Sequence, residues 1–302
     1  MTSPAVVHSD GYFADIGVHV FPMRKFRLLR EEIVRRGLLA DQDILVPQPA
    51  TPEQVLRVHD RAYVDKLTLG RLSVLEEALL ELPYSKQLVD ASFLCAGGSI
   101  LAAREARTRG VGINLGGGFH HAFPDHGEGF CVFNDVAIAI RALQHEGLVR
   151  RAAVIDLDVH QGNGTAAIFR DDPSVFTFSM HDEDNYPAIK PPSDLDVGLD
   201  KGTAGAEYLA ALERHVPAIL DRHRPDLVAY VAGADPFEED QLGGLKLTRE
   251  DLRRRDRVVF DTAASREIPV AAFLAGGYAL KLEDTVGIHA DMVEGAFQTA
   301  RA

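Results

Sequence analysis

Four short apolar runs, each followed at once by glycine or by acidic and histidine side chains, constrain the fold of this chain most strongly. They span residues 111–115, 152–155, 227–232 and 270–274. Small and β-branched residues in runs of this length are typical of parallel strands buried on both faces. Helical patterns separate the runs, which predicts an α/β fold with a mainly parallel sheet and helices on both faces. Residues 1–302 are expected to form a single domain, with any site at the carboxyl ends of the strands.

The remaining pattern predicts where the other elements lie. Residues 23–37 and 53–69 are each predicted to form one amphipathic packing helix with solvated Lys and Arg side chains, and residues 88–106 a longer apolar helix. A further strand is expected at 174–179. The polar, proline-containing interval at 181–200 is expected to be a loop, and its length favours a substrate rim.

One strand end carries metal-ligand side chains at strand spacing. Asp156, Asp158 and His160 alternate directly behind the run at 152–155, so they project the same way. Asp158 and His160 can therefore reach one ion, with Asp156 just behind them. The alternative is that the aspartates are turn and helix-capping residues before the Gly-Asn-Gly-Thr segment. One oxygen and one nitrogen ligand suit Zn²⁺ or a neighbouring divalent metal, and a third ligand is then required.

Three other strand ends offer independent chemical groups. Three glycines precede His120 and His121, Gly-Ala precedes Asp235, and Gly-Gly precedes Tyr278. Glycine lets the backbone turn sharply and pass close to other groups. Open parallel sheets gather their ligands at the carboxyl ends of the strands, so these partners favour a shared site over isolated turn residues. Asp235 is then the candidate for the missing carboxylate.

Five sequence blocks, in this order along the chain, resemble those of the zinc-dependent histone deacetylase family, and in particular its class IV branch and bacterial relatives. The blocks are Gly-Gly-Gly-Phe-His-His at 116–121, Gly-Phe-Cys at 129–131, Asp-Leu-Asp-Val-His-Gln-Gly-Asn-Gly at 156–164, Gly-Ala-Asp at 233–235 with Leu-Gly-Gly-Leu at 242–245, and Gly-Gly-Tyr at 276–278. The resemblance covers nearly the whole chain. The resemblance implies the arginase/deacetylase-like fold and an amide-hydrolysing activity.

By this resemblance, Asp158, His160 and Asp235 are the ligands of a catalytic Zn²⁺, with Fe²⁺ as an alternative. Such a metal lowers the pKa of its water to about 7 and polarises the acyl carbonyl. The arginase-like ureohydrolases, which share the fold, place a bridging aspartate where this chain has Gly162. Glycine offers no ligand atom, so a single metal is expected.

The resemblance also assigns the residues that move protons. His121 is implied as the general base that later protonates the leaving amine, and His120 as its electrostatic and hydrogen-bonding partner. Tyr278 is implied as the donor to the oxyanion, a role whose loss costs about 2.7–4 kcal/mol in comparable sites. Asp156 is placed to hold His120, and Asn163 to hold His121 where some family members carry Asp. Because Asn is neutral, His121 is expected to stay unprotonated near neutral pH.

Further residues are implied to bind substrate or a second ion. Gly129 and Phe130 are expected to line the channel for the acyl-lysine side chain, with Tyr186 on the opposite wall and Gly276 also at the substrate. The same acidic segment that supplies the metal ligands is implied to frame a structural K⁺ beside Ser179.

The implied activity is hydrolysis of the amide of Nε-acyl-lysine, by a deacetylase or a fatty-acyl deacylase. An acetylpolyamine amidohydrolase is the main alternative, and an inactive acyl-lysine-binding module is a third. Long acyl chains need an apolar cavity, which the segments 116–118 and 275–277, all glycine except Ala275, provide if the missing side chains leave open space. If these glycines serve only tight turns, packing closes the base of the site and an acetyl group fits.

Composition restricts the partners. The formal net charge of −13 disfavours nucleic acid and accommodates an acylated lysine peptide, protein or polyamine. The two cysteines, Cys95 and Cys131, are too few for a disulfide framework. The start of the chain lacks a signal-peptide pattern, and no run approaches about 18 apolar residues. We therefore expect a cytoplasmic protein without a membrane span.

Overall fold

Seven strands form one sheet across residues 3–301, which the computed structural model describes. The strands are β1 (Ala5–Val7), β2 (Val111–Asn114), β3 (Ala152–Asp156), β4 (Val175–Asp182), β5 (Leu195–Leu199), β6 (Leu227–Val231) and β7 (Val270–Phe273). Their order is β1-β2-β7-β6-β3-β4-β5, and every neighbouring pair is parallel. The predicted α/β class with a mainly parallel sheet is therefore confirmed.

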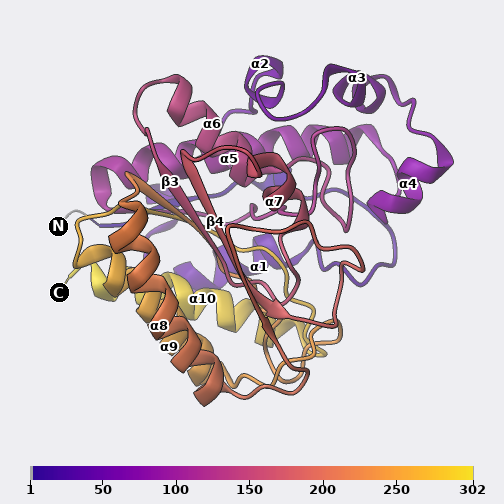
Figure 1. Cartoon of the computed structure of the whole chain (residues 1–302). Helices are drawn as coiled ribbons and strands as arrows, with labels where there is room; N and C mark the ends of the chain where they lie inside the picture. The colour runs from indigo at the N-terminus through magenta and orange to yellow at the C-terminus, as the bar shows by residue number, and fades with distance from the viewer. Residues whose placement is uncertain (1–2, 302) are drawn as a thin grey trace.

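Helices cover both faces of this sheet (Figure 1). The α-helices are α1 (Lys25–Arg35), α2 (Pro52–Val55), α3 (Arg61–Leu69), α4 (Val74–Leu80), α5 (Lys86–Arg109), α6 (Asp135–His145), α7 (Asn163–Phe169), α8 (Gly205–His223), α9 (Arg249–Ala264) and α10 (Leu282–Thr299). On one face, α5 packs on β1, β2 and β7 and against α6. On the other, α8, α9, α10 and α1 pack in succession. Within residues 3–301, none of the helices is both long enough and apolar enough to cross a membrane.

Four adjacent strands bring the chemical groups of the sequence to one edge. The strands β2, β7, β6 and β3 are neighbours in that order, and their last residues are level with one another in the pairing register. Asn114 pairs with Phe273, Phe273 with Val231, and Val231 with Asp156. The four loops that follow these residues therefore start side by side at the carboxyl edge of the sheet.

The segment at 53–69 is two helices and not the single helix that was predicted. Between α2 and α3 the chain turns at residues 56–60, and this turn buries His59. Nδ1 of His59 lies 2.9 Å from the carbonyl oxygen of Phe123, and its Nε2 accepts from the backbone N–H of Asn134 at 3.0 Å. These tertiary hydrogen bonds outweigh the local preference for one continuous helix.

The interval at 181–200 is not a continuous loop, because it contains β5. The side chains of β5 are exposed or half-buried up to Leu199, which is buried. A polar edge strand of this kind lacks the apolar signal of a buried strand. The strand predicted at 174–179 is present and extends to Asp182 as β4.

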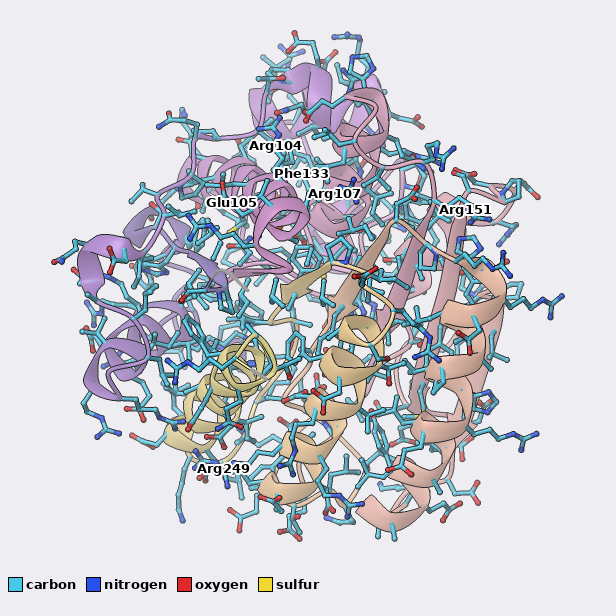
Figure 2. The ribbon with its side chains drawn as sticks, turned by 90° about the vertical axis from the view of Figure 1, so that its left-hand side faces the viewer. Arg104, Glu105, Arg107, Phe133, Arg151 and Arg249 are labelled. Carbon is cyan, nitrogen blue, oxygen red and sulfur yellow. The ribbon has the colours of Figure 1, made fainter. Side chains whose placement is uncertain are left out.

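Arginines connect elements at the opposite edge of the sheet, where the strands begin (Figure 2). Arg107, near the end of α5, donates to the carbonyl oxygen of Asp226 at 3.1 Å, directly before β6. Arg151, directly before β3, donates to the carbonyl oxygen of Arg224 at 2.6 Å. These side chains join α5, β3 and the segment between α8 and β6, so the two edges of the sheet carry different chemistry.

Candidate active site and metal centre

Three buried ligand-type side chains converge just beyond β3 and β6. Asp158 and His160 follow β3, Asp235 follows β6, and one ligand atom of each lies within 4.8 Å of the others. Nδ1 of His160 lies 3.0 Å from a carboxylate oxygen of Asp158 and 3.5 Å from one of Asp235. The structure therefore brings together the three residues that the sequence analysis singled out as metal ligands.

The electrostatics of this triad fit a divalent cation. Burial and the nearby Asp158 raise the pKa of Asp235 to about 7, and its Oδ2 has no hydrogen-bond partner among the described residues. Burial lowers the pKa of His160, but Asp158 and Asp235 outweigh it and raise the pKa to about 10. Two carboxylates and an imidazole that attract positive charge so strongly match the donor set of Zn²⁺ or Fe²⁺.

Backbone N–H groups fix the two carboxylates from behind. Val159 donates to Oδ1 of Asp235 at 2.9 Å, and Gly276 donates to Oδ2 of Asp158 at 2.8 Å. A Cβ at Gly276 would lie 1.8 Å from Oδ2 of Asp235, so only glycine fits there. Gly276 was expected at the substrate. In the structure it supports the carboxylates and is not among the residues that line the channel described below.

Close packing at Gly162 leaves no room for a ligand side chain at this position. A Cβ at this position would lie 2.3 Å from Oδ2 of Asp156 and 3.3 Å from Nδ1 of His120. A bridging aspartate would therefore displace the contact between these two side chains. The arrangement supports a site for one metal.

His120 lies among acidic neighbours. Its Nδ1 is 2.7 Å from Oδ2 of Asp156, and its Nε2 is 3.7 Å from Oδ1 of Asp158. Burial lowers the pKa of this imidazole, but the two carboxylates outweigh burial and raise the pKa to about 9. The two carboxylates therefore favour the protonated form of His120.

His121 faces a neutral partner. Its Nδ1 lies 2.7 Å from Oδ1 of Asn163. Burial, followed by the charges of His120 and His160, places the pKa of His121 well below its usual value of 6.5. The ring is therefore neutral at pH 7, and because its Nδ1–H is donated to Asn163, its Nε2 carries the free lone pair.

The start of α6 clamps the backbone that carries both histidines. The buried carboxylate of Asp135 accepts the N–H of Gly118 at 3.1 Å and that of Phe119 at 2.7 Å. Nδ2 of Asn134 donates to the carbonyl oxygen of His120 at 3.3 Å. These roles were not predictable from the sequence, because an Asn-Asp pair at a helix start is typical of capping. Asn134 also caps α6.

A channel of about 180 Å³ opens onto this site. Its lining consists of Glu81, His121, Gly129, Phe130, His160, Asn185, Tyr186, Leu242 and Tyr278. The ring of Tyr186 meets that of His121 edge to face at 5.0 Å, and Phe130 meets Tyr278 in the same way at 6.0 Å. The aromatic rings thus form an apolar passage that ends at the two histidines His121 and His160.

Most of the expected channel residues lie in this lining. Gly129, Phe130 and Tyr186 are there, as the resemblance implied, and Glu81 and Leu242 are additional. Glu81 directly follows α4, and the carbonyl oxygens of the last two residues of α4 accept the N–H groups of Gly129 and Phe130 at 3.2 and 3.0 Å. These contacts join segments far apart in the sequence, so no local pattern could have revealed Glu81.

Tyr278 lies beside the metal triad. Its ring centroid is 6.5 Å from that of His160, and its backbone N–H donates to Asp240 at 2.6 Å. Burial and the surrounding carboxylates raise the pKa of its phenol well above the usual value. The hydroxyl therefore stays protonated and can donate a hydrogen bond.

Lys25 corrects the expectation that the lysines of the first predicted helix are solvated. It is 1% exposed, and its Nζ donates to the carbonyl oxygen of Ala275 at 2.6 Å and lies 5.9 Å from the centroid of the Tyr278 ring. Burial lowers its pKa to about 8, while Asp235 and Asp158 oppose that shift. A buried cation at this place offsets the charge of the carboxylates and holds the loop before Tyr278.

The glycines after β2 and β7 do not leave open space, and the premise of a roomy acyl pocket was wrong. A Cβ at Gly116 would lie 2.2 Å from the ring of Tyr12, and one at Gly118 would lie 2.5 Å from the backbone of Ala275. Neighbouring groups already occupy the volume that the missing side chains vacate. The missing side chains therefore leave no cavity at these positions.

The expected monovalent cation site remains a prediction. Asp156 pairs with Ser179 across β3 and β4, so the acidic segment does lie beside this serine. The hydroxyl of Ser179 is 2.9 Å from Nδ1 of His181.

Comparisons with known proteins agree on one protein family. The histone deacetylase domain family matches residues 19–292. The chain is 43% identical to an uncharacterized protein of Picosynechococcus sp., with 96% of each chain covered. It is 30% identical to histone deacetylase 2 of Arabidopsis thaliana, covering 97% of this chain and 79% of that protein. The solved HD domain of HDA15 matches the fold with a TM-score of 0.83 at 22% identity, over 99% of this chain and 90% of that one.

Proposed function

Because the chain belongs to the histone deacetylase family, we propose that it hydrolyses the amide of Nε-acyl-lysine with one bound divalent metal, Zn²⁺ or alternatively Fe²⁺. Membership identifies the chain as an amidohydrolase of acetyl-lysine or related amides. One observation carries the finer proposal: the ligand triad, a neutral His121 and the phenol of Tyr278 meet at the end of one channel. We retain the cytoplasm as the expected compartment.

The side chains divide the work of hydrolysis among them. When bound, the metal supplies a nucleophile at neutral pH by lowering the pKa of water, and it polarises the acyl carbonyl. His121 takes up a proton at its free Nε2 and returns it to the leaving amine. Tyr278 donates its hydroxyl hydrogen to the carbonyl oxygen as negative charge develops there. His120, held as a cation by Asp156, supplies positive charge beside the reacting groups.

The channel fits a slender aliphatic side chain with a small acyl group. Phe130, Tyr186 and Leu242 give it apolar walls, which suit the four-carbon stem of lysine. Because neighbouring groups fill the space beside Gly116 and Gly118, we propose that the base of the site is closed and takes an acetyl-sized acyl group. On one peptide carrying acetyl-, octanoyl- or myristoyl-lysine, kcat/KM should fall with chain length. A rise with chain length would contradict the closed base.

An acylated polyamine is the second candidate substrate, and one residue favours it. Glu81 lines the channel, and burial and the nearby Glu128 raise its pKa. A carboxylate there can attract the distal ammonium of a polyamine. Leu242 and Phe130 in the same lining are apolar and suit the aliphatic stem of either substrate.

Parallel turnover assays distinguish the candidates. The metal-loaded protein is given an acetyl-lysine peptide and an acetylpolyamine side by side, and Glu81→Gln serves as the variant. The lysine proposal expects efficient cleavage of the peptide and little effect of Glu81→Gln. Preferred cleavage of the polyamine, weakened by Glu81→Gln, would support the second candidate. A metal-bound protein that cleaves neither would support an inactive acyl-lysine-binding module.

A further inference from the structure

We infer that Glu128 is a positioning residue for this hydrolysis, because it holds Asn163, and through Asn163 the base His121, in the orientation that proton transfer requires. The inference rests on the proposed function of the same site. Glu128 lies in a tight turn, in which its backbone exchanges two hydrogen bonds with Cys131 at 3.2 and 2.9 Å. Its side chain is only 16% exposed.

The carboxylate of Glu128 joins the partner of the base to the channel wall. Its Oε1 accepts from Nδ2 of Asn163 at 2.6 Å and from the hydroxyl of Tyr186 at 2.9 Å. Its Oε2 lies 3.3 Å from Nε2 of His126. Burial opposes ionisation, but hydrogen bonds from His126, Tyr186 and Asn163 lower the pKa of Glu128, so it is a carboxylate at neutral pH.

An acceptor on Nδ2 of Asn163 decides which way the amide faces. An amide presents an oxygen on one side and an NH₂ group on the other, and the two orientations have similar shapes. With Glu128 on the NH₂ side, the oxygen must face Nδ1 of His121, as observed at 2.7 Å. Nδ1 then carries the hydrogen, and Nε2 stays free to take up a proton. A flipped amide would place the hydrogen on Nε2 and block the base.

In this chain, two residues therefore share the role of orienting His121, which a single aspartate could fill. An aspartate at 163 would present an oxygen to His121 in either orientation and would need no acceptor behind it. Asn163 needs a hydrogen-bond acceptor for its NH₂ group, and Glu128 is that acceptor. The negative charge of Glu128 therefore lies one side chain farther from His121 than the charge of an aspartate at 163 would. Glu128 and Asn163 thus form a matched pair.

The second contact of the same oxygen extends this role to substrate binding. Tyr186 lines the channel and packs against His121, and its hydroxyl is anchored on Glu128. Loss of Glu128 therefore loosens one wall and the base together. Tyr186→Phe loosens only the wall, so it should raise KM by a larger factor than it lowers kcat.

Steady-state kinetics of the zinc-loaded protein on an acetyl-lysine peptide test the pairing. Glu128→Ala should lower kcat roughly 10–100-fold, the usual range for residues that orient active-site groups. Glu128→Gln keeps an oxygen acceptor and should restore most of the activity. Asn163→Asp alone places two carboxylates in contact and should also lower kcat. The double variant Glu128→Ala with Asn163→Asp removes that repulsion and should exceed both single variants.

Asp125→Ala is the matched control. Asp125 lies in the same turn region and contacts the same His126, at 2.7 Å, but it touches neither Asn163 nor Tyr186 in the hydrogen bonds of the described residues. It should retain wild-type kcat. Thermal unfolding of each variant verifies that loss of kcat is not loss of fold.

The tautomer of His121 gives a readout that does not depend on turnover. In ¹⁵N NMR of zinc-loaded protein, with His121→Ala for assignment, the wild type should carry its hydrogen on Nδ1, and Glu128→Ala should shift population to Nε2–H. A wild type that cleaves no acyl-lysine peptide would defeat the proposed function, while the tautomer still decides the role of Glu128. Unchanged tautomer in Glu128→Ala, or a double variant no better than the single ones, would overturn the inference.

Discussion

His120 and His121 are adjacent in sequence, their ring centroids are 4.0 Å apart, and both rings are buried. Their charge states nevertheless differ. Nδ1 of His120 meets the carboxylate of Asp156 at 2.7 Å, whereas Nδ1 of His121 meets the amide oxygen of Asn163 at the same distance. The pKa is raised to about 9 for His120 and lies well below 6.5 for His121.

The difference shows that burial alone does not set the protonation of these imidazoles. Burial lowers the pKa of both rings, as expected for a group that is cationic when protonated. Only His120 has carboxylates close enough to outweigh it, and the resulting cation further lowers the pKa of His121. His120 is thereby suited to supply positive charge, and His121 to accept a proton.

Loss of a metal ligand should have the largest effect, because Asp158 belongs to the triad and also supports the charge of His120. Asp158→Ala, His160→Ala or Asp235→Ala should abolish turnover and sharply lower metal content, while the core keeps the fold. Elemental analysis with activity assays measures both. Exposed Asp65→Ala is the control. Full zinc stoichiometry in all three variants would rule out the assignment.

Removal of the neutral ring should separate catalysis from metal binding. His121→Ala deletes a base and not a ligand, so it should retain metal and lose turnover roughly 10²–10⁴-fold. Metal content and kcat on an acetyl-lysine peptide check this. A variant that loses its metal, or one with near-normal kcat, would contradict the role given to His121.

Conversion of Asp156 to Asn should make the two histidine environments alike. Without that carboxylate, the pKa of His120 should fall from about 9 toward its usual value, and kcat should drop roughly 10–100-fold. If the cation is needed, the alkaline fall of kcat/KM should move to lower pH in Asp156→Asn. An alkaline limb that stays in place would show that His120 does not act as a cation.

The smallest expected effect is on kcat/KM of the wild type as the pH falls from neutral to 6.5. A base with a pKa below 6.5 is neutral above that pKa and is protonated only as the pH falls through it. The value of kcat/KM should therefore stay constant from neutral pH down to 6.5 and fall only below it. A fall that begins above pH 7 would mean that His121 is not the depressed group.

Sequence could predict the strand ends but not the contacts between them. The runs before His120, Asp158, Asp235 and Tyr278 were recognisable because buried parallel strands are continuously apolar and their ends are abrupt. The structure places these four loops side by side. The edge strand β5 lacked such a signal because its side chains are mostly exposed or half-buried.

Residues that act through long-range contacts left no local pattern. Lys25 sits in a helix whose other basic residues gave no reason to expect burial, and its partner Ala275 is 250 positions away. Glu128 contacts Asn163 and Tyr186, which are 35 and 58 positions distant. A single sequence does not reveal such pairs, because neither helical nor strand periodicity relates them.

The central claim is that two adjacent imidazoles hold opposite charge states at neutral pH. The most direct test is a ¹⁵N NMR titration of both rings in the metal-free wild type. At pH 7, His120 should be protonated on both nitrogens and lose a proton near pH 9, while His121 should be neutral with its hydrogen on Nδ1. Two rings in the same protonation state at pH 7 would contradict it.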